Sequence, residues 1–289
     1  MTPSPDVAAK MDRLLARVGE YGGVAVAFSG GVDSSVVAKA ARLALGDRAV
    51  AVTADSPSVP RAEVAEAQAL AKRIGIRHVL IQTDEFADPD YVKNDGARCF
   101  FCKDELYTRI EGKLPELNAA IICSGANLDD LGDYRPGLKA AADHAVRHPL
   151  QEAGFTKADV RELARHWNLP TWDKPASPCL SSRLAPGVAV TADRTRRVEL
   201  AEAFLKQRGF RDLRVRLHED DLARIEVPRT EIGRFGDLSF SEEFARYLKT
   251  LGFRYVTLDL EGFRSGNLND LIPLEDRRLN HSPTEVIAQ

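Results

Sequence analysis

The sequence predicts an α/β fold in which a domain with a mainly parallel sheet, residues 1–175, precedes a smaller α+β domain, residues 176–289. In the first part, short runs that are apolar throughout alternate with helical patterns, which is typical of a parallel sheet covered on both faces. This alternation stops in a proline-rich segment, residues 169–187, and the later strand patterns predict an antiparallel hairpin with one solvent-facing side. The domain boundary is therefore placed near residue 175.

The strand and helix patterns follow one another in a regular order. The first strand, residues 24–28, leads through a glycine-rich turn into a helix from about Ser34 to Leu45. In an open parallel sheet, ligands bind at the carboxyl ends of the strands, so residues 29–34, 54–56 and 125–133 are expected to surround one crevice. The other expected strands are 49–53, 78–82, 119–124, 213–217 and 222–227, and the other expected helices are 61–74, 157–167 and 191–208.

The composition is that of a globular protein with a core, and it argues against several other classes. Of 289 residues, 44% are hydrophobic and 29% are charged. The net charge of -3 argues against a protein that wraps nucleic acid, which usually carries a basic surplus. No apolar run approaches the ~20 residues of a membrane helix, and the N-terminus lacks the pattern of a signal peptide. These features predict a cytoplasmic protein that binds small anions and neither membranes nor nucleic acid.

A glycine-rich string between the first strand and the first helix predicts a phosphate site; it reads SGGVDS at residues 29–34. Its glycines let backbone amides approach an anion closely, and the following helix adds N–H groups and the positive end of its dipole. The hydroxyls of Ser29 and Ser34 can donate hydrogen bonds, and Asp33 can hold Mg²⁺ against phosphate oxygens. The alternative, a tight turn with an N-cap serine, explains a glycine and a serine but not the whole string.

Three of the four cysteines have a pattern that can serve chemistry. Cys99 and Cys102 form a CxxC pair before a helical segment, and Cys179 lies in the proline-rich segment. Three thiolates are one ligand short of a closed tetrahedral Zn or Fe–S site, so an open position can hold a ligand such as sulfide. A dithiol redox pair, a low-pKa nucleophile at Cys179 beside Arg183, and simple packing of the pair are the alternatives. Cys123 ends an apolar strand and is expected to be a buried structural residue.

Longer motifs give the sequence a resemblance to a known family. The SGGVDS string resembles the loop of the N-type ATP pyrophosphatases, the PP-loop superfamily, which cleave ATP between the α and β phosphates; no Walker A lysine follows it. Further motifs are SGANLDDLGDYRPG at residues 124–137, WDKPA at 172–176 followed by Cys179, and LDLEGFRSG at 258–266. Together, over nearly the whole chain, they resemble the LarE family of sulfur transferases of nickel-pincer nucleotide biosynthesis.

This resemblance implies a HUP-like N-terminal domain and an ATP-dependent reaction. Members of the family adenylate the carboxylates of pyridinium-3,5-biscarboxylate mononucleotide, release pyrophosphate and replace an oxygen of each carboxylate by sulfur. One form of the family sacrifices the sulfur of a single cysteine, and the other holds a [4Fe–4S] cluster on three cysteines. Cys179 matches the cysteine shared by both forms, and the presence of Cys99 and Cys102 points to the cluster form. The resemblance also implies a sulfide donor, homo-oligomeric assembly and a functional link to the other nickel-pincer enzymes.

The expected site residues fall into three groups. Catalysis is assigned to Cys179 and Asp33, with Asp33 and Asp130 as the expected Mg²⁺ ligands. ATP is expected to contact the loops around the crevice, namely Ala27, Phe28, Ser29, Gly30, Gly31, Asp33, Ser34, Ala54, Ser56, Arg61, Gly125 and Asn127. The anionic substrate is expected to bind guanidinium groups and one glutamate, namely Arg183, Glu202, Arg214, Arg216 and Arg264.

Several of these assignments have alternatives. Arg214 and Arg216 share one face of a strand, so a solvated, salt-bridged sheet face is the alternative to a site for the substrate phosphate. The aspartates at positions 129, 130 and 133 can simply cap turns. At the level of function, a tRNA-thiolating enzyme of the PP-loop superfamily and a nucleotide sensor without chemistry are the competing hypotheses.

Overall fold

The computed structural model describes residues 2–132 and 136–264, so Asp133 and the end of the LDLEGFRSG motif lie outside the described residues. Its contacts divide the chain into two compact units. Unit 1 comprises the residues up to Asp84 and Cys99–Ser177, and unit 2 comprises Glu85–Arg98 and the residues from Pro178 onward. The hydrophobic pattern of the sequence does not assign residues 85–98 to the second unit.

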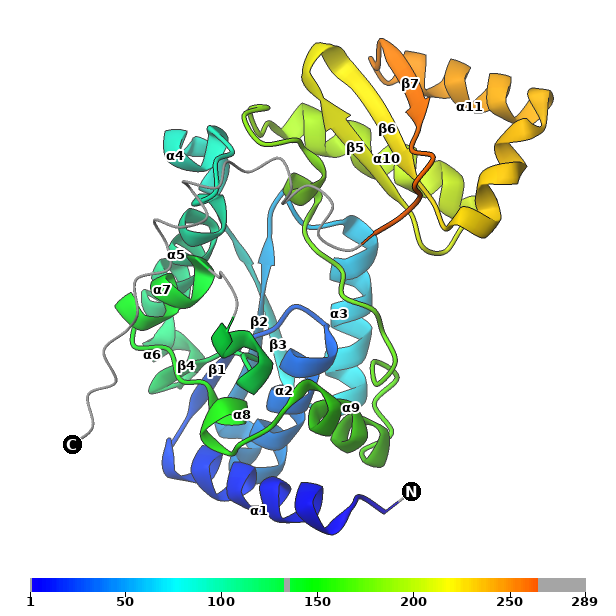
Figure 1. Ribbon diagram of the computed structural model, residues 1–289. Helices are drawn as coiled ribbons and strands as arrows, with labels where there is room; N and C mark the ends of the chain where they lie inside the picture. The colour runs from blue at the N-terminus through cyan, green and yellow to red at the C-terminus, as the bar shows by residue number, and fades with distance from the viewer. Residues whose placement is uncertain (1, 133–135, 265–289) are drawn as a thin grey trace. The chain divides into compact units, whose positions relative to one another are not determined.

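Unit 1 is built on an all-parallel sheet in the order β3-β2-β1-β4 (Figure 1). Alternate residues of a strand point to opposite faces, and here both faces are buried. Val24 and Val26 pack into one core cluster, and Ala25 packs into the other. The strands are β1 (Val24–Ala27), β2 (Ala49–Asp55), β3 (Arg77–Gln82) and β4 (Ile121–Cys123). Apolar strands in a sheet covered on both sides confirm the predicted α/β class.

Helices cover both faces of this sheet. One core cluster joins it to α1 (Pro5–Glu20), α2 (Val32–Leu45), α3 (Arg61–Ile74) and α9 (Lys157–His166). The other joins it to α5 (Arg98–Glu111) and α7 (Pro136–Asp143), while α6 (Leu114–Leu117) and α8 (Pro149–Glu152) are short helices. Because β1 and β4 are parallel neighbours, the loops that follow them meet at the same edge of the sheet.

Within the described residues, no helix is long and apolar enough to cross a membrane.

Unit 2 contains a sheet in the order β5-β6-β7 (Figure 1). β5 (Arg214–His218) and β6 (Leu222–Glu226) form the predicted antiparallel hairpin. β7 (Tyr255–Leu258), which the sequence pattern does not indicate, pairs in parallel with β6. The helices of this unit are α4 (Pro89–Val92), α10 (Ala192–Gln207) and α11 (Leu238–Thr250).

Buried polar side chains tie residues 85–98 into unit 2. Asn94, only 2% exposed, donates hydrogen bonds to the carbonyls of Ala185 and Val188 at 2.8 and 2.9 Å. The Tyr91 hydroxyl lies 2.7 Å from Oγ of Ser181. These bonds join positions far apart in the chain, which a local sequence pattern does not predict.

The prediction that one side of the hairpin faces solvent is wrong. Arg216 is 6% exposed and Glu226 is 0% exposed. The chain that follows Cys179 lies along β5, because Leu184 forms a bridge to Leu217 and Nη1 of Arg216 donates to the Ser182 carbonyl at 3.1 Å. This nonlocal segment lies along β5, and Arg216 and Glu226 are paired inside unit 2 instead of being solvated.

Candidate functional site

The glycine-rich string at residues 29–34 forms the turn between β1 and α2. Gly30 adopts a φ of 70°, and a Cβ there would lie 3.3 Å from Ala67 of α3, so both conformation and space favour glycine. The Ser29 hydroxyl accepts a hydrogen bond from the Gly31 amide at 3.3 Å and lies 3.2 Å from Oγ of Ser34. Gly31 is the N-cap of α2 and makes no side-chain bond to its first turn. An uncapped helix N-terminus beside a glycine turn is suited to an anion.

The loop after β4 packs directly against this turn. A Cβ on Gly125 would lie 2.7 Å from the Ser34 amide nitrogen and 3.0 Å from the Asp33 carbonyl carbon, so the backbones touch here. Nδ2 of Asn127 donates to Oδ1 of Asp33 at 3.1 Å. The structure therefore brings together the predicted residues of the first and fourth strand ends.

Lys157, a residue that the sequence analysis did not assign to the site, completes this group. It begins α9, and its ammonium group pairs with the second carboxylate oxygen of Asp33. Its backbone amide donates to Asp129 at 2.7 Å. A lysine at the phosphate loop adds a cation that can bind phosphate oxygens.

Asp129 and Asp130 make contacts typical of turn caps. Oδ2 of Asp130 accepts the Asn127 amide at 2.9 Å, and Asp130 is 8% exposed. Oδ1 of Asn127 in turn accepts the Asp129 amide at 3.0 Å. These bonds fix the loop that carries Asn127. A Mg²⁺ role for Asp130 stays a prediction.

The end of β2 supplies the third loop of unit 1. Arg61 pairs with Asp55 and donates to the carbonyls of Ser56 and Val59 at 2.6 and 2.9 Å. This guanidinium holds the pKa of the Asp55 carboxyl below its ordinary value. Arg61 is thus a loop-ordering residue in this structure, next to Ala54 and Ser56. The side chain of Phe28 is buried in the core, so a nucleotide contact at Phe28 would be made by its backbone.

The cysteines differ in exposure and in location. Cys99 is exposed and Cys102 half-buried, and both lie within the first five residues of α5 in unit 1 and not before a helix as predicted. The half-buried Cys179 belongs to unit 2. Among the described residues, no three His, Cys, Asp or Glu side chains are grouped as metal ligands. Cys123 is 0% exposed, and burial raises the pKa of its thiol to about 12, which confirms that it is a buried residue kept as a neutral thiol.

Unit 2 holds a cluster of paired charges around β5 and β6. Nε of Arg183 lies 3.0 Å from Oε1 of Glu202 on α10, and both side chains are almost fully buried. Nη2 of Arg216 lies 3.0 Å from Oε2 of Glu226, whose Oε1 also pairs with Arg224 at 3.1 Å. Arg183 also donates to the Cys179 carbonyl at 2.8 Å, so the cluster holds the backbone of the candidate sulfur-bearing residue.

Arg214 joins this cluster, while Arg264 pairs elsewhere. Burial, followed by the neighbouring Arg183, lowers the pKa of Arg214. The Arg214 guanidinium carbon also lies 5.0 Å from the centre of the Phe263 ring. Arg264 pairs with Glu261, and its side chain is 50% exposed. Four of the five predicted substrate-binding residues are therefore in or beside one charge cluster.

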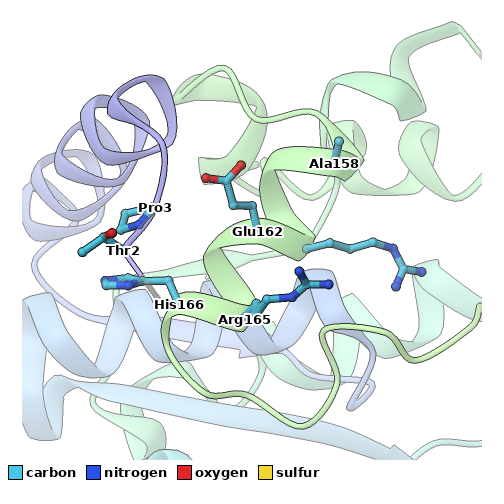
Figure 2. A pocket seen from close by; sticks show the side chains of 7 residues that line it. Thr2, Pro3, Ala158, Glu162, Arg165 and His166 are labelled. Atoms are coloured by element: carbon cyan, nitrogen blue, oxygen red, sulfur yellow. The ribbon is translucent and has the colours of Figure 1, made fainter.

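A separate hollow of about 430 Å³ lies in unit 1, and Figure 2 shows the side chains around it. Glu162 accepts the Ser4 amide at 2.5 Å, and Arg161 donates to the Trp172 carbonyl at 2.8 Å. The residues that line the hollow come from the N-terminal segment and α9, namely Thr2, Pro3, Ala158, Arg161, Glu162, Arg165 and His166. None of these residues belongs to the loops around Asp33, so we do not assign the reaction to this hollow.

Comparison with known proteins gives the family. The family model for NAD synthase matches residues 7–110, which contain the glycine turn. The chain is 45% identical over 264 residues to an uncharacterised protein of Synechocystis, covering 91% of this chain and 98% of that protein. It is 41% identical over 268 residues to the pyridinium-3,5-bisthiocarboxylic acid mononucleotide synthase of Lactiplantibacillus plantarum, covering 92% of this chain and 96% of that protein. The chain belongs to the LarE family.

Membership of the LarE family confirms the resemblance found in the motifs. This LarE-family chain also matches a tRNA-specific 2-thiouridylase of Cereibacter sphaeroides at 27% identity over 192 residues, which is 53% of this chain and 50% of that protein. The functional candidate that sequence reasoning missed is Lys157. The local sequence around Lys157 contains a capping box, Thr156 and Asp159, which predicts that a helix begins there. It does not predict that this helix begins beside the glycine turn.

Proposed function

We propose that this protein is an ATP-dependent sulfur transferase that adenylates the carboxylates of pyridinium-3,5-biscarboxylate mononucleotide and replaces an oxygen of each by sulfur. The observation that carries the proposal is the similarity, over 92% of this chain and 96% of the relative, to a synthase named for the bisthiocarboxylic acid product. The glycine turn between β1 and α2 supports it, because that turn has the geometry of a phosphate site.

The proposed first step makes the carboxylate reactive. A carboxylate oxygen attacks the α-phosphorus of ATP, the bond to the pyrophosphate oxygen breaks, and pyrophosphate leaves. The loop amides, the N-terminus of α2 and Lys157 would stabilise the negative charge on the departing group. Asp33, whose oxygens here face Lys157 and Asn127, would hold Mg²⁺ on the phosphate oxygens.

The proposed second step transfers sulfur. A sulfur nucleophile attacks the acyl carbon, the carbon–oxygen bond to AMP breaks, and AMP and the thiocarboxylate are released. We assign sulfur delivery to the three accessible cysteines, Cys99, Cys102 and Cys179. Their thiolates would hold a [4Fe–4S] cluster, which when bound supplies sulfide at its open iron and spares the cysteines. The donor set fits this group, because soft thiolates are its usual ligands and one position stays open.

Two features of the chain support the use of these three cysteines. Cys99 and Cys102 are three residues apart in α5, so they lie on the same face of that helix. Arg98, the residue bonded to Cys99, donates from Nη1 to the Ser181 carbonyl at 2.8 Å within unit 2. The residue before Cys99 is thus held by the loop that begins at Cys179.

The charge cluster of unit 2 is the proposed site for the anionic groups of the substrate, and Arg264 is a further proposed contact. Cations outnumber anions by one in this cluster, namely Arg183, Arg214, Arg216 and Arg224 against Glu202, Glu226 and Asp259. The pKa of Arg214 is lowered, which means that the nearby glutamates, Glu202 and Glu226, do not fully offset the cost of burying its positive charge. An incoming phosphate or carboxylate would compensate that charge and bind two guanidinium nitrogens at once.

The proposal is tested with anaerobically purified full-length protein, the mononucleotide, Mg-ATP and sulfide. The expected result is thiocarboxylate, AMP and pyrophosphate in equal amounts, from protein that contains iron and acid-labile sulfide. Replacing Cys99, Cys102 or Cys179 by alanine should abolish sulfur transfer, whereas Cys123→Ala is the matched control and should retain it. Transfer without iron, with a sulfur atom lost from Cys179, would instead establish the sacrificial route. Absence of ATP-dependent product would refute the proposed function.

The second candidate, tRNA thiolation, is favoured by the match to the 2-thiouridylase, although that match spans 53% of this chain. The net charge of -3 argues against it, because tRNA binding normally uses a basic surface. The same assay with tRNA in place of the mononucleotide separates the two. Sulfur incorporated into tRNA, with none in the mononucleotide, would establish thiolation of tRNA.

A further inference from the structure

The segment that leads to Cys179 is held to helix α3 by Glu63. Oε2 of Glu63 lies 2.8 Å from Nζ of Lys174, and Oε1 accepts the Ser177 hydroxyl at 2.8 Å. Lys174 also pairs with Glu66 at 2.8 Å. Burial opposes the charge of Lys174, but the hydrogen bonds that its ammonium group donates to the two glutamates outweigh burial and raise the pKa of the lysine. All four residues belong to unit 1.

This anchoring point stands directly before the division between the two units. Ser177 is the last residue of unit 1, and Cys179 is two residues further along the chain. Pro178 fixes its own φ and favours an extended backbone at Ser177, so little freedom remains between the anchor and the thiol. On the unit 2 side, Arg183 donates to the Cys179 carbonyl at 2.8 Å. The chain around Cys179 is therefore held on both sides.

Glu63 also belongs to the helix that begins at the third loop of the nucleotide site. It lies in the first turn of α3, which starts at Arg61, and Arg61 donates to the Ser56 and Val59 carbonyls. One short helical turn thus carries both the residue that orders the loop after β2 and the residue that holds Ser177.

We propose that Glu63 and Ser177 are positioning residues for the sulfur-transfer step, which hold the Cys179 segment in reach of the activated carboxylate. The inference rests on the proposed function. With Ser177 anchored, the Cys179 Cα stays within ~7 Å of a fixed point. Without this bond the last fixed point before Cys179 is Lys174, whose carbonyl accepts a hydrogen bond from Nη2 of Arg161 at 3.1 Å. Lys174 is five residues from Cys179, so the Cys179 Cα can then lie up to ~17 Å from its anchor. Arg183 holds Cys179 only within unit 2, so without the Ser177 anchor the volume open to the thiol relative to unit 1 grows. Its effective concentration at the unit 1 loops then falls by up to roughly tenfold.

The chain offers matched variants for this test. Ser177→Ala and Glu63→Ala remove the anchor, and Ser177→Thr keeps the hydroxyl. Glu66→Ala is the control, because Glu66 shares the helix, the charge and the lysine partner but makes no bond to Ser177 in the structure. Single-turnover rates of pyrophosphate release and of thiocarboxylate formation are measured separately on the full-length holoprotein. We expect the two anchor-deleting variants to slow sulfur transfer roughly tenfold with pyrophosphate release within about twofold of wild type, and Ser177→Thr and Glu66→Ala to match wild type.

A second readout does not need the reaction. In protein freed of iron by a chelator, the rate of Cys179 alkylation by N-ethylmaleimide is measured by peptide mass. Ser177→Ala should raise this rate about threefold or more, because the segment opens more often, whereas Glu66→Ala should not. Three results would overturn the proposal. They are an unchanged alkylation rate of Cys179 in Ser177→Ala, equal losses of the sulfur-transfer rate in Glu63→Ala and Glu66→Ala, and a fall in pyrophosphate release as large as the fall in sulfur transfer. If wild-type protein transfers no sulfur, the proposed function fails, and alkylation alone decides whether Glu63 and Ser177 hold the segment.

Discussion

Replacing Gly125 by alanine should push the loop after β4 away from the phosphate turn. The added Cβ would lie 2.7 Å from the Ser34 amide nitrogen and 3.0 Å from the Asp33 carbonyl carbon, where ordinary contacts begin at 3.4 Å. The shortfall at the nitrogen is 3.4 − 2.7 = 0.7 Å, and both neighbours include backbone atoms that cannot rotate aside. Overpacking of this size costs about 1–3 kcal/mol of stability. A misplacement approaching 1 Å at a reacting group can reduce the rate by about 10²-fold.

The assay measures pyrophosphate release from ATP and the free energy of unfolding in urea. Gly125→Ala is expected to lose about 1–3 kcal/mol of stability and roughly 10- to 100-fold in the rate of release. Gly19→Ala is the matched control, because Gly19 is an exposed residue in the last turn of α1 and a Cβ there meets nothing within 4 Å. This control should keep full activity and gain at most about 0.5–1 kcal/mol in the free energy of unfolding, which is the advantage of alanine over glycine in the middle of a helix. Wild-type activity in Gly125→Ala would refute the close approach of the two loops.

Three further predictions follow from individual side chains. Lys157→Met should lower the rate of pyrophosphate release about tenfold or more without loss of fold, because it removes the cation at the phosphate turn; an unchanged rate for Mg-ATP would contradict that role. Cys123, with a pKa of about 12, should resist alkylation at pH 8 in the native protein and react only after unfolding, as peptide mass mapping would show. Burial lowers the pKa of His144, but hydrogen bonds to Glu111 and Asp104 outweigh it and raise the pKa. The stabilisation by its positive charge is therefore fully present below about pH 6.5 and is lost as the pH rises through the raised pKa. Between pH 6 and 8, the free energy of unfolding in urea should fall more for wild type than for His144→Gln.

Local patterns predicted much of unit 1. The helix expected at residues 61–74 is α3 as observed, because its apolar positions repeat with helical spacing and Gly75 ends it in a left-handed conformation. The glycine turn and its place between β1 and α2 were also predictable, since both follow from contiguous residues. Neighbouring parallel strands then place the loop of Gly125 beside it.

What local patterns could not predict depends on contacts between distant segments. The role of Lys157 requires knowing that α9 begins beside Asp33, which lies 124 residues earlier in the chain. The buried state of Arg216 and Glu226 requires the segment after Cys179 to cover β5. The alternation of charged and apolar residues is the same for a solvated face and for a buried ion-pair cluster. Likewise, the Asn94 bonds that join residues 85–98 to unit 2 have no signature in the neighbouring sequence.

The measurement that tests the central claim most directly follows the oxygen that sulfur replaces. The mononucleotide is prepared with a heavy oxygen isotope in its carboxylates and is converted with ATP and sulfide by the holoprotein. If the carboxylate is activated as its AMP ester at the glycine turn, the carbon–oxygen bond breaks in the transfer step, and AMP carries one heavy oxygen for every sulfur gained. Thiocarboxylate formed together with unlabelled AMP, or formed without ATP, would contradict the account.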